Sequence, residues 1–188
     1  RAVQAGAARL GFRPGMFGLS LSAGDPMKFK PSLATSISPP AHCFHADPFF
    51  WKQGKESWCF FESFDYRTGL GTICAGQLEA DRLVNIRTVL APGYHLSFPF
   101  LFEHDGQLFM MPESCATRRI ELWRCTAFPD TWELHKTVLA GTNPADSTLA
   151  EIEGQWWLFT NICDDPYGDM SSELHLYRAD GPMLDNLE

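Results

Sequence analysis

Three acidic residues have the type and the setting for acid–base chemistry: Asp47, Glu113 and Asp146. Glu113 closes the apolar run 108–111 after Pro112, and a carboxyl in an apolar setting has a raised pKa, which suits a general acid. Asp47 and Asp146 fall in strand-like segments, where a buried carboxylate is costly unless it is paired or used. The alternatives are structural: Asp47 starts a strand after a turn, Asp146 caps a turn, and Glu113 is a solvated strand end.

Histidines and aromatic residues accompany these acids. His45 lies two residues before Asp47, and His95 lies three residues before Phe98. A histidine beside a carboxylate can orient a hydroxyl group or tune the carboxylate, although a hydrogen-bonded loop histidine is the alternative. Four aromatic residues are candidate stacking platforms for sugar faces, with core packing as the alternative: Trp51, Tyr94, Phe98 and Trp157.

The elements that must position these residues form a repeat of about fifty residues. Equivalent first positions are Asp47, Phe98 and Asp146, which are separated by 51 and 48 residues (47 to 98 and 98 to 146). In every unit a second marker follows 15 residues later: Glu62, Glu113 and Asn161. A glycine turn lies between the two markers each time, so each unit begins with a predicted β-hairpin.

Each unit offers a third strand, at 71–76, 120–125 and 173–178, and the first two units offer a fourth, at 83–90 and 132–139. Four antiparallel strands per repeat predict an all-β β-propeller, with a β-sandwich of similar hairpins as the alternative. The expected blades are about 45–91, 95–140 and 144–188, and residues 1–40 are a lead-in or a divergent blade. We expect the propeller to be incomplete in this chain and to continue in a longer protein, because the last unit lacks its fourth strand.

The charge, the apolar runs and the cysteines of the chain limit the functions that it can have. The chain has 188 residues with 15 Lys and Arg against 23 Asp and Glu, a net charge of −8, which argues against a nucleic-acid partner. No run approaches the roughly 20 apolar residues of a membrane span. The six cysteines are scattered, so we expect structural thiols and a cytoplasmic location. We expect no cofactor, although the acidic run 164–169 could hold a divalent cation if it is not simply a solvated loop.

Several motifs point to one family. They are His-Ala-Asp-Pro-Phe at 45–49, Phe-Phe-Glu at 60–62, His-Leu-Ser-Phe-Pro at 95–99, Met-Pro-Glu-Ser at 111–114, Phe-Pro-Asp-Thr-Trp at 128–132 and Asp-Ser at 146–147. Over about residues 40–180 the sequence resembles the N-terminal domain family of glucosamine inositolphosphorylceramide transferases. The resemblance implies a five-bladed propeller of four-stranded antiparallel blades, similar to glycoside hydrolase families 43 and 32.

The resemblance also implies roles for individual residues. In the related hydrolases an aspartate base, a second aspartate that tunes and positions, and a glutamate acid converge on the channel. Asp47 looks like the base and Asp146 like the second aspartate. The hydrolase acid lies on a later blade, so Glu113 substitutes for it, or the acid lies outside this chain, or the site is not hydrolytic. The expected substrate-binding residues are His45, Glu62, His95, Ser97 and Trp51.

We therefore expect a carbohydrate-active domain with a glycosidase-like or glycosyl-transferring site acting on a glycan or glycolipid. The alternative is a non-catalytic carbohydrate-binding or scaffold domain attached to a glycosyltransferase or another catalytic domain. In the plant proteins of the family that this sequence resembles, the glycosyl transfer is attributed to a separate C-terminal domain. A propeller that only binds other proteins is a third and less favoured hypothesis, because acidic and aromatic residues in the channel do not specially favour that function.

Overall fold

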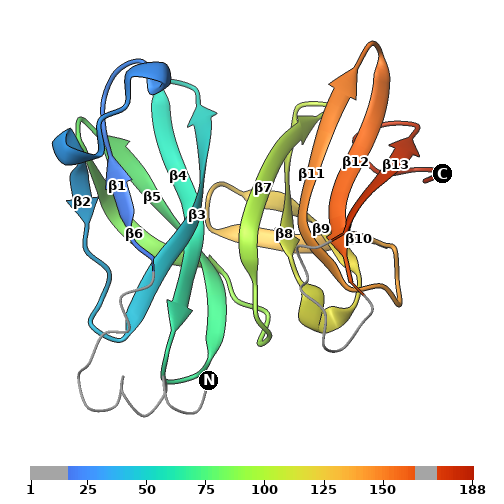
Figure 1. The fold of residues 1–188 in the computed structure, drawn as a ribbon, viewed down its shortest axis with the longest axis horizontal. Helices are drawn as coiled ribbons and strands as arrows, with labels where there is room; N and C mark the ends of the chain where they lie inside the picture. Colours follow the sequence, from blue (N-terminus) through green and yellow to red (C-terminus); the bar gives the residue numbers. More distant parts are fainter. Residues whose placement is uncertain (1–16, 164–172) are drawn as a thin grey trace.

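Three antiparallel sheets follow one another along the chain (Figure 1). The computed structural model describes residues 17–163 and 173–188, so the acidic run 164–169 lies outside the described residues. The first sheet contains β3 (Cys43–Gln53), β4 (Glu56–Asp65), β5 (Leu70–Glu79) and β6 (Arg82–Leu90). The second contains β7 (Ser97–His104), β8 (Gln107–Glu113), β9 (Ile120–Ala127) and β10 (Thr131–Val138). The third contains β11 (Pro144–Ile152), β12 (Gln155–Ile162) and β13 (Leu174–Ala179).

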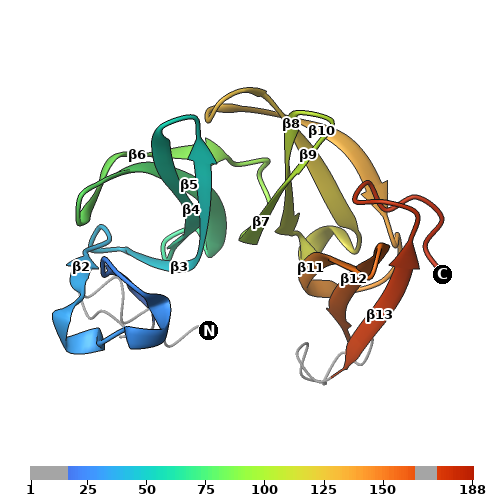
Figure 2. The ribbon, with the colours of Figure 1, turned by 90° about the horizontal axis from the view of Figure 1, so that it is seen from above.

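The sheets are arranged like the blades of a propeller. Within each sheet the strands pair in chain order, and the first strands β3, β7 and β11 lie on the inner side of an arc (Figure 2). β7 contacts both β3 and β11. The fold class predicted from the repeat, an all-β propeller of four-stranded antiparallel blades, is therefore confirmed. Within the described residues the arc does not close into a ring (Figure 2).

The first hairpin of each blade has a two-residue turn that contains a glycine: Gly54 is the first turn residue in the first blade, whereas Gly106 and Gly154 are the second turn residue in the other two. Gly54, Gly106 and Gly154 have φ values of 61°, 72° and 79° in the turns that join the first strand to the second. A positive φ costs glycine little, because it has no Cβ to clash with the backbone. The turn chemistry thus follows the same fifty-residue repeat as the strands.

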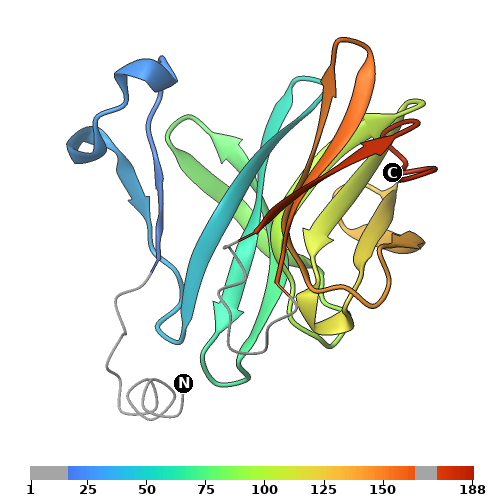
Figure 3. The ribbon, with the colours of Figure 1, turned by 45° about the vertical axis from the view of Figure 1, so that its right-hand side comes forward.

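A small N-terminal sheet stands beside the first blade (Figure 3). It pairs β1 (Leu19–Leu21) with β2 (Thr35–Ile37), and the short 3₁₀ helices Pro26–Lys28 and Pro31–Leu33 lie between the two strands. Leu19 and Ile37 pack on the first blade against Phe61, Cys59 and Cys74. The described part of segment 1–40 is thus attached to the first blade through an apolar contact.

Two apolar clusters join the blades to each other. The first fills the space between the first and second blades, and it includes Trp58, Phe60, Met110 and Trp132. The second joins the second and third blades around Met111, Leu122 and Leu158, which are fully buried. Five of the six tryptophans of the chain take part in these two clusters.

The C-terminal residues fold back beside the third blade. Arg178 and Glu188 exchange both backbone hydrogen bonds, at 2.9 and 3.0 Å, as a closely paired position of an antiparallel ladder does. Lys136 of β10 holds this segment from the neighbouring blade by donating to the carbonyl oxygen of Met183 and to the carboxylate of Asp185. In the described part of the chain, no helix has the length and apolar character needed to cross a membrane.

The interblade packing predicts a large effect for Phe60→Ala. Phe60 is 0% exposed and lies edge-on to Phe128 and Trp132. Its truncation leaves a cavity between two blades and should lower the free energy of unfolding by about 3–5 kcal/mol. Urea denaturation measures this loss. Phe50→Ala, at a side chain 59% exposed, is the matched control and should change the value by less than about 1 kcal/mol. Equal losses in the two variants would contradict the assigned core.

Candidate functional site

The inner strand of every blade carries the same irregularity. Ala46 pairs with Glu62 and Phe49 pairs with Phe60, so β3 has two residues between these pairs where β4 has one. One extra residue is therefore inserted in β3. The same shift occurs between Ser97 and Phe100 and between Ala145 and Thr148. An insertion of this kind is a β-bulge, which re-aims side chains and is frequent beside active sites.

The extra residue of each bulge has a left-handed backbone. The three residues are the first markers of the repeat, with φ values of 51°, 44° and 50°: Asp47, Phe98 and Asp146. Such values are uncommon outside glycine. The residues before the bulges pair with the second markers, Ala46 with Glu62, Ser97 with Glu113 and Ala145 with Asn161. The geometry therefore reproduces the spacing that defined the repeat in the sequence.

Carboxylates link one blade to the next at these bulges. The backbone N–H of Phe98 donates to Oδ2 of Asp47 at 3.2 Å. The backbone N–H of Asp146 donates to Oε2 of Glu113, also at 3.2 Å. Asn161 donates through its side-chain amide to Oδ2 of Asp146 at 3.5 Å. The first two bonds run from one blade to the next, and the third lies within the third blade.

Four carboxyl groups influence one another, and we call Asp47, Glu62, Glu113 and Asp146 the carboxyl cluster. Burial raises the pKa of Asp47, the hydrogen bond from Phe98 lowers it, and the negative charge of Asp146 raises it further. Burial also raises the pKa of Glu62 to about 8, and the charges of Asp47 and Glu113 add to this rise. The structure thus brings Glu62 into electrostatic contact with two of the three residues that the sequence suggested for catalysis.

Glu62 is the most confined member of the cluster. It is 5% exposed, and its Oε1 has no hydrogen-bond partner. Nε2 of His95 lies 3.7 Å from this oxygen. Nδ1 of His95 accepts a 2.8 Å hydrogen bond from the backbone N–H of Gly71, so in the neutral ring the proton is on Nε2, facing Glu62. At neutral pH this environment favours the protonated glutamic acid.

Gly71 is required for this arrangement because there is no room for a side chain. A Cβ at this position would lie 2.4 Å from Oε1 of Glu62, 2.4 Å from the carbonyl oxygen of Leu96 and 2.8 Å from His95. The backbone of Gly71 also accepts a hydrogen bond from the N–H of Leu96 at 3.0 Å. The sequence pattern predicted a third strand that begins at Gly71 but carried no signal for the role of this glycine.

A second buried acid, Glu121, was also missed. Glu121 is 0% exposed and accepts hydrogen bonds from the Tyr94 hydroxyl at 2.7 Å and the Trp123 indole at 3.1 Å. Arg119 forms a two-fold hydrogen bond with its other oxygen, at 2.8 and 3.0 Å. Because Tyr94 immediately precedes His95, this network anchors the loop that carries the histidine. A charged residue inside the apolar segment 120–123 was the available signal.

The other three predicted binding residues, His45, Ser97 and Trp51, lie in three different environments. His45 is 3% exposed, packs 4.7 Å from Phe61, and has no hydrogen-bond partner at Nδ1. Burial lowers its pKa, so the neutral ring is favoured. With Asp47 it lines a cavity of about 420 Å³ between the N-terminal sheet and β3. Ser97 is buried opposite Glu113, whereas Trp51 packs against the cluster between the first two blades and donates to Gln53.

The successive antiparallel sheets define the class of fold, a β-propeller. The solved structure of an α-L-arabinofuranosidase from Lactobacillus brevis superposes with a TM-score of 0.61 at 14% identity, covering 91% of this chain and 66% of that one. An exo-β-1,3-galactanase from Clostridium thermocellum gives 0.58 at 13% identity, covering 88% of this chain and 45% of that one. At these identities the likeness establishes the fold.

The family follows from sequence. Residues 30–185 match the family described as "Glucosamine inositolphosphorylceramide transferase 1, N-terminal", and the chain belongs to this family. Relatives of that name from Oryza sativa subsp. japonica and Arabidopsis thaliana are 33% identical over 142 residues and 32% identical over 143 residues. Each alignment covers 74% of this chain, and the chain spans about a fifth of the length of these relatives (19% and 18%).

The pKa of Glu62 predicts a pH dependence of stability. A raised pKa means that the folded state holds a proton that the unfolded chain loses, so the free energy of unfolding should fall between about pH 5 and 8. Glu62→Gln cannot ionise and should remove roughly a few kcal/mol of this fall. Urea denaturation at a series of pH values measures how the free energy of unfolding changes with pH in the wild-type protein and in Glu62→Gln. Glu79→Gln, at an exposed position, should keep the wild-type slope, and an unchanged slope in Glu62→Gln contradicts the assignment.

The space around Gly71 predicts that Gly71→Ala is costly. The added methyl group must displace Glu62, His95 or the backbone of Leu96, which should destabilise the fold by about 1–3 kcal/mol. It should also shift the ring resonances of His95, measured by NMR. Gly181→Ala is the control, since no atom lies within 4 Å of its Cβ position. If both variants behave alike, the close approach at Gly71 is not needed.

Proposed function

We propose that this propeller domain is carbohydrate-active and that its carboxyl cluster acts on a glycosidic bond of a glycan or glycolipid. The observation that carries the proposal is the electrostatic coupling of a proton-holding acid, Glu62, with an aspartate from the inner strand of the same blade, Asp47. Cleavage or transfer at a glycosidic bond uses one carboxyl that donates a proton and one that accepts a proton or attacks. The names of the relatives and of the solved propellers support the carbohydrate class.

We assign different roles to the members of the cluster. Asp47 is the general base, because its raised pKa increases its affinity for a proton and it lines an accessible cavity. Asp146 tunes Asp47 through its charge. The sequence suggested Glu113 as the acid, but Glu113 accepts a backbone hydrogen bond from Asp146, whereas burial raises the pKa of Glu62. We therefore assign the proton donor to Glu62, which holds its proton up to about pH 8.

A second function is favoured by the length of the relatives. The chain spans about a fifth of them, which leaves most of their length for other domains. In this case the domain binds the glycan or acts as a scaffold, and a fused catalytic domain performs the transfer. The carboxyl cluster then recognises sugar hydroxyl groups by accepting hydrogen bonds from them.

Substitution of Asp47 separates the two functions. The protein is incubated with nitrophenyl α-L-arabinofuranoside, β-D-galactoside and α- and β-D-glucosaminides, and nitrophenol release is measured against pH. Under the catalytic proposal at least one substrate is cleaved, and Asp47→Asn lowers kcat/KM by about 10²–10⁴-fold. Glu62→Gln should abolish the basic limb of the pH profile, whereas Glu113→Gln should keep it.

Asp105→Asn, at an exposed turn position, is the matched control and should retain full activity. Absence of turnover together with glycan binding that survives Asp47→Asn supports the scaffold function. Neither turnover nor binding to a glycan array would overturn both functions.

A further inference from the structure

A mixed set of metal-binding side chains lies at the open end of the first hairpin of the first blade. Cys43 and Asp65 are directly paired at this end of β3 and β4, and His42 precedes Cys43. One ligand atom from each side chain, an imidazole nitrogen, the thiol sulfur and a carboxylate oxygen, lies within 4.8 Å of the other two. This set is separate from the carboxyl cluster, and neither the fold nor the proposed function uses it.

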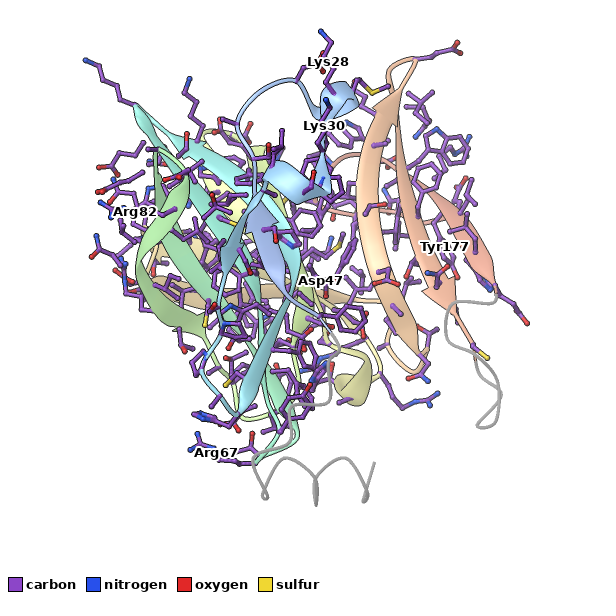
Figure 4. All side chains as sticks on the ribbon, turned by 60° about the vertical axis from the view of Figure 1, so that its left-hand side comes forward. Lys28, Lys30, Asp47, Arg67, Arg82 and Tyr177 are labelled. Carbon is purple, nitrogen blue, oxygen red and sulfur yellow. The ribbon has the colours of Figure 1, made fainter. Side chains whose placement is uncertain are left out.

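The position of the set in the molecule allows an ion to enter. The side chains of His42 and Asp65 are 36% and 22% exposed, and Cys43 is half-buried. The cysteines at positions 59, 74, 125 and 163 are buried. Figure 4 shows Arg67, two residues beyond Asp65, at the lower end of the molecule, well below Asp47. Cys43 is therefore the most accessible thiol among the cysteines whose side chains the structure describes.

The chemistry of the three ligands selects the ion. Calcium and magnesium prefer an all-oxygen shell, whereas a thiolate and an imidazole with one carboxylate are ligands of zinc. Zinc holds nitrogen, oxygen and sulfur ligands at about 2.0–2.3 Å, which places them roughly 3–4 Å apart in a tetrahedron. Rotation of surface side chains can close the present separations to these values. A thiolate and a carboxylate also neutralise the charge of the ion.

We propose that His42, Cys43 and Asp65 form a zinc-binding site with three protein ligands and a fourth position open to water. The paired backbone of Cys43 and Asp65 fixes two of the ligands across a ladder, so little chain entropy is lost when the ion binds. Backbone hydrogen bonding of the Tyr66 N–H to the His42 carbonyl, at 2.9 Å, holds the third ligand at the same end of the hairpin.

Arg67 competes with the ion for Asp65. Its Nε donates to Oδ1 at 3.1 Å and its Nη2 donates to Oδ2 at 2.6 Å, while Nε2 of His42 lies 3.8 Å from Oδ2. The ion must take one carboxylate oxygen and leave the other to Arg67, or displace the guanidinium. Because Arg67 is 62% exposed, its side chain can swing into solvent. Removal of this cation should therefore strengthen zinc binding.

The test uses the metal alone on the reduced protein. Zinc affinity is measured by competition with a chromophoric chelator, and cobalt(II) substitution reports the thiolate through its near-ultraviolet charge-transfer band. We expect one ion per chain and a band that Cys43→Ser removes. His42→Ala and Asp65→Asn should each weaken binding by at least about tenfold. Arg67→Ala should strengthen it several-fold.

A matched histidine–carboxylate pair provides the control. Nε2 of His104 lies 3.5 Å from Asp105, much as His42 lies beside Asp65, but this pair is not part of a three-ligand group with a cysteine among the described residues. His104→Ala should leave affinity and the cobalt band unchanged. Binding without a thiolate band, a band that survives Cys43→Ser, or equal loss in His104→Ala and His42→Ala would overturn the site. Retained circular dichroism in each variant shows that a loss is not due to unfolding.

Discussion

One extra residue in the inner strand of each blade is the constraint on which the rest of this structure depends. In an unbroken antiparallel ladder, the N–H groups of an edge strand alternate between its partner strand and its free edge. At the bulge the ladder is interrupted, and the N–H of Phe98 or Asp146 is available to a carboxylate of the preceding blade. The same local distortion thus joins the blades and places acidic side chains on their inner edge.

This arrangement lowers the stability of the folded state as well as fixing the geometry of the site. A buried carboxyl without a hydrogen bond at one oxygen, as in Glu62, opposes folding once it ionises, because desolvation penalises its charged form. The surrounding structure limits this cost through fixed neighbours. Gly71 gives the carboxyl its space and holds the ring of His95, and Glu121 anchors the adjacent Tyr94. Both oxygens of Glu121 have hydrogen-bond partners, and a buried polar network with its partners in place is rigid.

The fold could be predicted from the sequence because it is built from a repeated unit. Strand period, turn glycines and the constant step between markers all recur, so three weak signals reinforced one another. The acids at the bulges followed from the same alignment. By contrast, Gly71 and Glu121 occur once each, and their roles depend on neighbours more than 20 residues away in sequence, His95 for the glycine and Tyr94 for the glutamate. A local pattern cannot show such a contact, whereas a charged residue in an apolar strand indicates only that some partner must exist.

The differences among the repeats are as informative as their common frame. At the second marker, the first blade has a buried acid, Glu62, the second a carboxylate that accepts a backbone N–H, Glu113, and the third an amide that donates to Asp146. Because Phe98 replaces aspartate at the first marker of the middle blade, Glu113 supplies the link to the third blade. Burial raises the pKa of the first-blade acid, Glu62, to about 8. A symmetric ring of aspartates would place equal charges around the axis, whereas this succession of side chains places a buried acid with a raised pKa beside carboxylates that accept hydrogen bonds from the backbone of the next blade.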